Sequence, residues 1–193
     1  MTESLKGLRA FLREAAALKD HLRNSWTRGG RRESVAEHSW RVALTALALR
    51  EADPTTKAET DLGRVLALCL VHDLGEALGG DVPAASMPDR AAKTARERAD
   101  LAALLAPAPD GARAAIAALW EEHESGDTPE ARISRAADKL ETVMQHAEGA
   151  NPPGFDYGFN LDYGRAQTDA HPVAAALRAL VDVETAKRRD AEI

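Results

Sequence analysis

The chain has 193 residues, of which 29% are charged, and a formal net charge of −6. This length suits a single domain over residues 1–193 with a sizeable core. The acidic balance, without any sustained basic stripe, excludes a general binder of nucleic acid polymers. The lone cysteine, Cys69, excludes a disulfide framework and suits a reducing cytoplasm. No apolar stretch approaches the length of a membrane span, so we expect a cytoplasmic protein without a membrane partner.

In the first half of the chain, apolar residues recur at helical spacing and predict helices over 3–22, 34–50 and 58–74. Ser34, followed three residues later by Glu37, has the pattern of a capping box that starts the second helix. Asp53-Pro54 ends that helix, because the residue before a proline disfavours the helical conformation. Polar loops that contain paired glycines are expected over 24–33 and 79–83.

The second half of the chain continues the helical pattern over 89–106, 110–124, 129–149 and 172–188. Thr128-Pro129 places a capping residue before a proline in the first turn of the helix from 129. The stretch 151–164 is rich in glycine and aromatic residues, so 151–193 is expected to form an aromatic loop and a C-terminal helix. The abundance of alanine and leucine and the small number of β-branched residues also favour an all-α protein. The sequence therefore predicts an all-α bundle of about six to eight helices.

Four residues with metal-binding side chains lie within these apolar helices: His38, His72, Asp73 and Asp138. Taken singly, His38 has an ordinary interpretation as a hydrogen-bonded core histidine, and Asp138 as a surface or capping residue. An ionisable His-Asp pair in a helical core needs compensation for its desolvation, which a divalent metal supplies. Taken together, the four residues favour metal ligation.

The ligand set also indicates which metal and which chemistry. Two imidazoles and two carboxylates suit Mn, Fe, Co, Ni or Zn, whereas an all-oxygen site would suit Mg or Ca. With one His-Asp pair and few further histidines, one divalent metal is expected. Such a metal lowers the pKa of its bound water and polarises a phosphoryl group. Glu76, four residues after His72, is placed to orient or deprotonate that water or to protonate the leaving oxygen.

The chain resembles the HD-domain phosphohydrolases, and more narrowly their 5′-deoxynucleotidase branch with its eukaryotic HD-domain-containing relatives. The resemblance covers roughly 5–150 and is carried by ESVAEHS at 33–39, VHDLGE at 71–76, GDVP at 80–83, WEEHE at 120–124 and ADK at 137–139. It implies an all-α HD fold that hydrolyses 5′-deoxynucleoside monophosphates to deoxynucleoside and phosphate. The expected partner is therefore a small nucleotide, and a homodimer is expected on the resemblance alone.

The resemblance also implies roles for individual residues. The metal ligands fall on His38, His72, Asp73 and Asp138, and the catalytic residues on Glu76 and Asp73. Asp81 matches the aspartate that contacts the sugar hydroxyl, and Trp26 suits the tryptophan at the deoxyribose. Arg23 and Arg28 compete for the arginine that contacts the phosphate, because the stretch from Trp26 to His38 is about two residues shorter than the family pattern.

Three other interpretations stay open. The same metal site would also serve a nucleoside triphosphate, a specialised nucleotide or a non-nucleotide phosphate ester. An HD-fold oxygenase needs ligands for a second iron, which this chain lacks at recognisable spacing. A non-catalytic nucleotide sensor would hold a vestigial metal, although every candidate ligand is present.

Several further residues are expected to have no direct part in the site. Glu121 and Glu122 are expected to be solvated, with support of the site as the alternative. Surface or loop positions are expected for His123, His146 and His171. The aromatic residues of the late loop are expected to cover a core edge or a dimer contact rather than to stack on a base; these are Tyr157, Phe159 and Tyr163.

Overall fold

Long helices build the fold in the computed structural model, which describes residues 1–82 and 89–191. Within those residues, seven helices have ten residues or more: α1 (Thr2–Ala15), α2 (Val35–Ala52), α4 (Leu62–Val71), α6 (Arg90–Leu105), α7 (Asp110–Ser125), α8 (Pro129–Glu148) and α11 (Pro172–Ala191). The shorter segments are the 3₁₀ helix η1 (Ala16–Lys19), α3 (Pro54–Glu59), α5 (Glu76–Gly79), α9 (Tyr157–Asp162) and α10 (Arg165–Thr168). The predicted all-α class is confirmed, and Pro83 of the predicted loop lies outside the described residues. None of the helices described is both long and apolar enough to cross a membrane.

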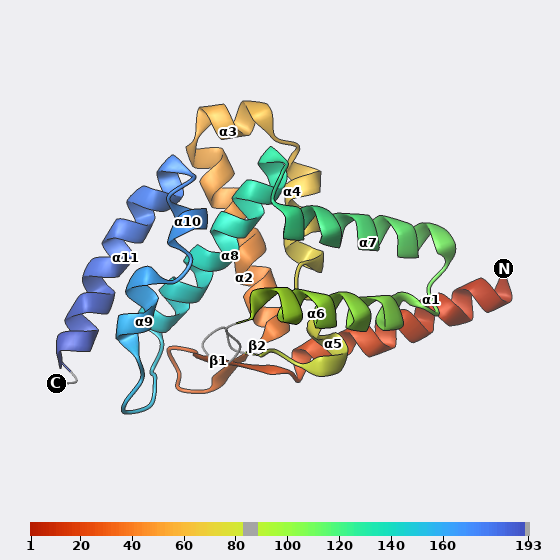
Figure 1. Cartoon of the computed structure of the whole chain (residues 1–193), viewed down its shortest axis with the longest axis horizontal. Coiled ribbons are helices and arrows are strands. Elements are labelled where there is room, and N and C mark those ends of the chain that lie inside the picture. The colour runs from red at the N-terminus through yellow and green to blue at the C-terminus, as the bar shows by residue number, and fades with distance from the viewer. Residues whose placement is uncertain (83–88, 192–193) are drawn as a thin grey trace.

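Helices α2 and α8 cross at the centre of the molecule, with α4 beside them and α11 along the outer side of α8 (Figure 1). Their facing sides bury an apolar core that includes Val42, Leu49, Val65, Ile133 and Leu140. These residues recur at three- and four-residue spacing because one face of each helix is turned inward. Burial of this stripe stabilises the three-helix centre.

A second core joins α1, α6 and α7 and includes Phe11, Leu101, Leu105 and Trp120. Helices α2 and α4 contribute to both cores. Val35 at the start of α2 packs in the second core, whereas Val42 belongs to the first. His38 of α2 therefore lies where the two cores meet.

A two-stranded hairpin replaces the end of the predicted first helix and the predicted loop over 24–33. Strand β1 (Leu22–Trp26) pairs antiparallel with β2 (Arg32–Ser34), and Gly30 takes a φ of 83° in the turn between them. This left-handed conformation suits glycine because it has no Cβ. The hairpin is also held by α8, since Gln145 donates from Nε2 to the carbonyl oxygen of Trp26 at 2.5 Å. Neither strand shows apolar alternation, so sequence periodicity did not reveal it.

The helix predicted over 58–74 is interrupted in the structure, because α3 ends at Glu59 and α4 begins at Leu62. Asp53 caps the short α3 by accepting from the backbone N–H groups of Thr55 and Thr56, and Asp61 caps α4 through Arg64 N. Helix α4 ends at Val71, so the residues that follow it lie in turns at its carboxyl end. The capping box at the start of α2 is confirmed, because Ser34 and Glu37 each accept from the other's backbone N–H.

Candidate metal centre and its cavity

The predicted metal ligands come from three elements and converge on one point. His38 lies in the second turn of α2, His72 and Asp73 follow α4, and Asp138 lies in the middle of α8. His38 Nε2 is 3.3 Å from Asp138 Oδ1 and 3.7 Å from Asp73 Oδ2. His72 Nε2 is 3.2 Å from the same oxygen of Asp73. The structure thus brings together all four residues that the sequence singled out as ligands.

Three of these converging atoms are buried and have no hydrogen-bond partner within residues 1–82 and 89–191: His38 Nε2, His72 Nε2 and Asp73 Oδ2. Unpaired buried polar atoms are costly and rare in folded proteins. A divalent cation held at their centre would satisfy all three at once, and imidazole nitrogens with carboxylate oxygens are ligands that transition metals accept. The residues present therefore fit a divalent metal.

The outer nitrogen of each histidine is fixed by a second contact. His72 Nδ1 lies 2.8 Å from the carbonyl oxygen of Cys69, which can only accept, so Nδ1 carries a proton and Nε2 is the nitrogen that faces the site. His38 Nδ1 lies 2.5 Å from Glu141 Oε2, and both side chains are fully buried. Such contacts orient metal-binding histidines and raise their basicity. Glu141 was missed in the sequence, although it lies three residues after Asp138 on the same side of a helix.

The charges around the ligands favour a bound cation. Burial raises the pKa of Asp73, but His72, His38 and Arg23 outweigh it and hold that pKa well below its usual range. The pKa of Asp138 is likewise lowered, mainly because Lys139 and His38 outweigh its burial. Both carboxylates are therefore ionised at neutral pH and present negative charge to the site.

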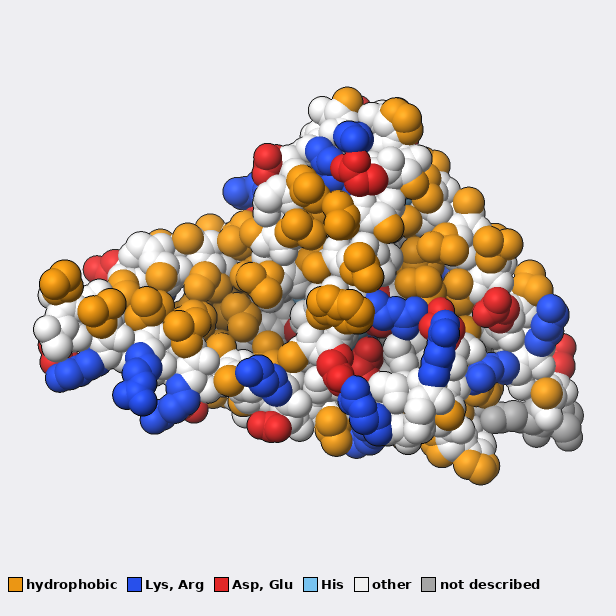
Figure 2. Space-filling view, turned by 180° about the vertical axis from the view of Figure 1, so that it is seen from behind, with side chains coloured by type: hydrophobic (Ala, Val, Ile, Leu, Met, Phe, Trp, Pro, Cys, Tyr) orange, Lys and Arg blue, Asp and Glu red, His pale blue; other side chains and the backbone are white. Residues whose placement is uncertain are grey.

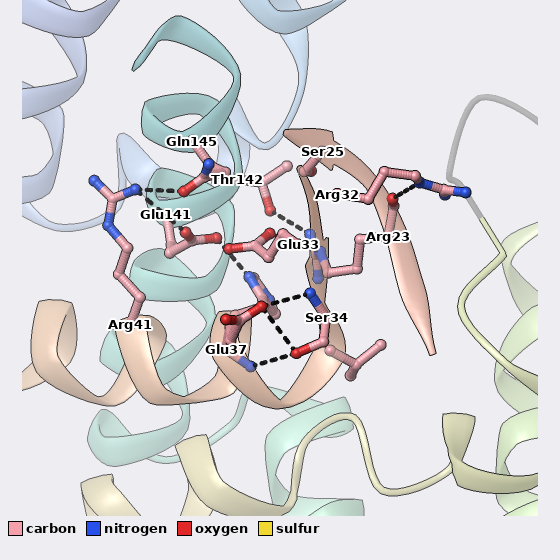
Figure 3. A network of polar contacts seen from close by, with 12 residues as sticks. Arg23, Ser25, Arg32, Glu33, Ser34, Glu37, Arg41, Glu141, Thr142 and Gln145 are labelled. Atoms are coloured by element: carbon pink, nitrogen blue, oxygen red, sulfur yellow. Dashed lines mark hydrogen bonds and ion pairs between the residues drawn. The ribbon is translucent and has the colours of Figure 1, made fainter. Parts of the chain in front are cut away.

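Arg23 of β1 points toward Glu33 and Thr142 (Figure 3), and it also lies near the ligand Asp73. Its Nη2 donates to Thr142 Oγ1 at 3.1 Å, its Nε lies 3.4 Å from Glu33 Oε2, and its Nη1 lies 3.7 Å from Asp73 Oδ2. Burial lowers the pKa of Arg23, but the surrounding carboxylates outweigh this and raise it. The competing Arg28 is 77% exposed and pairs with Glu148 at 2.8 Å, away from the ligands.

A cavity of about 350 Å³ opens above the ligands. Asp73 and Asp138 form part of its lining, while His38 and His72 are buried beneath. Of the predicted substrate-binding residues, Arg23, Trp26 and Asp81 line this cavity, whereas Arg28 does not. Lys93 and Lys139 add two cations to its wall, which suits an anionic ligand.

Glu76 lies at the first position of α5 and is 4% exposed. Lys93 donates from Nζ to its Oε1 at 3.3 Å, while Oε2 has no partner among the residues that the structure describes. Burial and the neighbouring Asp73 and Asp81 raise the pKa of Glu76 well above its usual range, against the opposing effect of Lys93. A carboxyl group of this kind, lining a cavity beside a metal site, is able to move a proton in catalysis.

Two of the three histidines expected at surface or loop positions lie elsewhere. His123 is buried on α7, and its ring centroid lies 5.1 Å from that of His72. His146 lines the cavity on α8. His171 lies in the loop between α10 and α11 as expected, although its side chain is buried. His123 and His146 gave no signal in the sequence because their partners lie on other elements.

The late aromatic segment also differs from expectation. Tyr163 packs against the edge of the first core as expected, and Tyr157 is buried, but Phe159 and Tyr163 also line the cavity. Glu121 is half exposed and pairs with Arg98, in line with the solvated position expected, whereas the Glu122 side chain is only 9% exposed and accepts from Arg64 and Thr128. The segment after residue 150 is therefore part of the site.

Comparisons with known proteins agree with this architecture. A family model described as HD domain matches residues 15–178. A protein named 5′-deoxynucleotidase HDDC2 from Danio rerio is 31% identical over 140 residues, which cover 72% of this chain and 67% of that protein. The human protein of the same name is 30% identical over 145 residues, which cover 74% of this chain and 68% of the relative.

A solved structure of a predicted metal-dependent phosphohydrolase from Magnetospirillum magnetotacticum superposes with a TM-score of 0.79. It shares 33% sequence identity and covers 96% of this chain and 94% of its own. The predicted resemblance is confirmed by these matches together with the converging ligands. The chain belongs to the HD domain family.

Proposed function

We propose that this protein is a divalent-metal-dependent phosphohydrolase that removes the 5′-phosphate from deoxynucleoside monophosphates. The observation that carries the proposal is the group of unpaired ligand atoms beneath a cavity whose wall holds three cations, Arg23, Lys93 and Lys139. The substrate class is supported by the relatives named 5′-deoxynucleotidase.

His38, His72, Asp73 and Asp138 would hold one divalent metal of the Mn, Fe, Co, Ni or Zn type. When bound, such a metal supplies a water of lowered pKa and polarises the phosphoryl group. Glu141 and the carbonyl oxygen of Cys69 keep the two imidazoles in the tautomer that leaves Nε2 free.

Arg23 binds the phosphate in this proposal. Its guanidinium is held between Glu33, Asp73 and Thr142, so it is oriented before the substrate arrives. An arginine offers several donors in one plane, which matches the oxygens of a phosphate. Binding there would also offset the repulsion between the phosphate and the carboxylates of the site.

Glu76 handles the proton of the reaction. Hydrolysis joins a water oxygen to phosphorus, breaks the bond from phosphorus to O5′ and delivers a proton to O5′. The free Oε2 of Glu76 takes a proton from the attacking water or gives one to the leaving oxygen. The contact of Oε1 with Lys93 keeps the carboxyl group in place.

The sugar lies between Trp26 and Asp81 in this arrangement. Both residues line the cavity, and Asp81 would accept a hydrogen bond from the 3′-OH. The Trp26 backbone is fixed by Gln145, so its ring would crowd a 2′-OH and favour deoxyribose.

We also propose a cytoplasmic homodimer. Large apolar side chains remain exposed on α1 at Leu5 and Leu12 and on α2 at Trp40 and Leu44. Figure 2 shows apolar side chains gathered along α1 and onto the middle of one face. Exposed apolar surface of this kind is typical of protein contacts. Sedimentation of the wild type beside Trp40→Glu would show a dimer that dissociates, whereas a wild-type monomer would refute the proposal.

The Glu76→Gln variant tests the catalytic assignment. Glutamine keeps the size of the side chain but cannot exchange a proton, so phosphate release should fall by about 10²- to 10⁴-fold. Metal content should stay at the wild-type level, because Glu76 is not among the converging ligands. A variant that retains hydrolysis would remove Glu76 from the mechanism.

A further inference from the structure

The amide of Asn160 presents an unused donor at the cavity. Asn160 lies in α9, is 1% exposed and lines the cavity, yet its Nδ2 has no hydrogen-bond partner in the described part of the chain. The other unpaired buried atoms on this wall belong to the metal and phosphate end of the site. The unpaired amide nitrogen of Asn160 therefore lies away from the metal ligands, and neither the metal site nor the packing of the described residues accounts for it.

A chain of hydrogen bonds joins this amide to His146 and Ser25. Asn160 Oδ1 lies 2.8 Å from His146 Nδ1, and His146 Nε2 lies 2.9 Å from Ser25 Oγ. Burial lowers the pKa of His146, so its ring is neutral and carries one proton. Because the amide oxygen faces the ring in this structure and can only accept, Nδ1 carries the proton and Nε2 accepts from Ser25. The amide oxygen is thereby occupied and Nδ2 is left as the free donor.

The backbone around Asn160 is rigid. The buried Arg178 of α11 donates from Nη2 to the carbonyl oxygen of Asn160 at 2.5 Å and from Nη1 to that of Tyr163 at 2.8 Å. Its Nε donates to Asp182 at 2.6 Å. A donor held on a rigid element binds a ligand with little loss of conformational entropy.

The position of Asn160 corresponds to the base of a bound nucleotide. Asp138, Thr142 and His146 follow one another at four-residue spacing along the cavity side of α8. The two helical turns from Asp138 to His146 span about 12 Å, which is comparable to the distance from a nucleotide's phosphate to the far edge of its base. Asn160 contacts His146, which is at the end of this row away from Asp138, so it would lie near the base of a nucleotide whose phosphate is at the metal.

Aromatic side chains surround the same end. Phe155 and Phe159 line the cavity, and the Phe155 ring lies 5.0 Å from His146 and 6.0 Å from Trp26 between centroids. Phe159 is 38% exposed, so its ring is available to a ligand. Aromatic rings of this kind stack on bases without regard to sequence, so the polar donor would fix the orientation of the base.

We propose that Asn160 is a substrate-binding residue that donates a hydrogen bond from Nδ2 to an acceptor on the nucleobase, while Phe155 and Phe159 contact the base face. This inference rests on the proposed function. His146 and Ser25 act as positioning residues, because they hold the amide through its oxygen. The chain would then discriminate nucleotides from phosphorylated sugars that lack a base.

The test compares a deoxynucleoside monophosphate with 2-deoxyribose 5-phosphate, the same ester without its base. For the wild type, kcat/KM should be higher for the nucleotide. Asn160→Ala should lower kcat/KM for the nucleotide about tenfold, because a base acceptor is left unpaired, and should leave the sugar phosphate unchanged. Gln167→Ala, which removes an amide outside the cavity on α10, should change neither.

Asn160→Asp separates binding from structure. Aspartate keeps an oxygen for His146 but replaces the Nδ2 donor, so the preference for the nucleotide over the sugar phosphate should again fall. A preference equal to that of the wild type in Asn160→Asp would refute the inference, as would an equal loss for both substrates in Asn160→Ala. Failure of the proposed function has a different signature, since the wild type would then hydrolyse neither compound.

Discussion

Glu141 provides the sharpest test of how the metal site is held. The change Glu141→Gln keeps the size of the side chain and an oxygen that can accept from His38 Nδ1, but it removes a negative charge. The two atoms lie 2.5 Å apart and both side chains are fully buried, so no solvent screens the loss. Removal of such an outer partner costs about 10- to 100-fold in metal affinity, which corresponds to about 1.4–2.8 kcal/mol.

The assay is competition for one divalent metal between the protein and a chromophoric chelator at fixed pH. Glu148→Gln is the matched control, because Glu148 lies on the same helix and pairs with Arg28 and Arg41 away from the ligands. The control should retain wild-type affinity. If Glu141→Gln bound metal as tightly as the control, Glu141 would serve only to balance the charge of Arg23 and Arg41, and the reasoning would be refuted.

Two further predictions follow from buried groups. Arg23→Lys should raise the KM for the nucleotide and weaken inhibition by inorganic phosphate at least tenfold. The control Arg28→Ala should change neither quantity. Equal effects of the two substitutions in steady-state assays would overturn the assignment of Arg23 as the arginine that binds the phosphate. Burial raises the pKa of the Cys69 thiol to about 12, so a thiol reagent should leave it unmodified at pH 8 until the chain is unfolded. Since the unfolded thiol ionises from its ordinary value of 9.0, the free energy of unfolding should fall as the pH rises from about 9 to 12. Denaturant titrations would measure how the free energy of unfolding depends on pH. The dependence should be steeper for the wild type than for Cys69→Ala, and equal dependences would contradict the raised pKa of the thiol.

Local sequence patterns predicted the helices because each pattern has a local cause. The stripe through Val42 and Leu49 marks the buried face of α2, and the Ser34–Glu37 capping box marks its start. The capping residue Thr128, followed by Pro129 in the first turn, likewise placed the start of α8. These signals act within one or two helical turns and are legible without the tertiary structure.

Features that depend on distant partners could not be predicted in this way. The contact of His38 with Glu141 spans 103 positions, and that of Arg23 with Thr142 spans 119. The hairpin owes its stability to α8 rather than to alternating apolar residues. Asn160 gives no signal either, because its proposed role depends on contacts with His146, and through it with Ser25, on other elements.

The ligand residues could be chosen from the sequence, but the contacts that hold them in place could not. The residue types and their order along the chain favour one metal, and the fold brings the four side chains together. Their functional roles rest on the proposed activity, as does the assignment of Trp26 and Asp81 to the sugar. The outer contacts to Glu141 and Cys69 depend on the tertiary packing of α2, α4 and α8, which leaves no local pattern in the sequence.

The most direct test of the central claim is phosphate release by chelator-treated protein resupplied singly with Mn, Fe(II), Co, Ni or Zn. The substrates would be deoxyribo- and ribonucleoside mono- and triphosphates. The proposed function predicts no turnover without metal, restoration by at least one of these ions, and preference for deoxynucleoside monophosphates. Turnover that persists without metal, or hydrolysis confined to triphosphates, would contradict it.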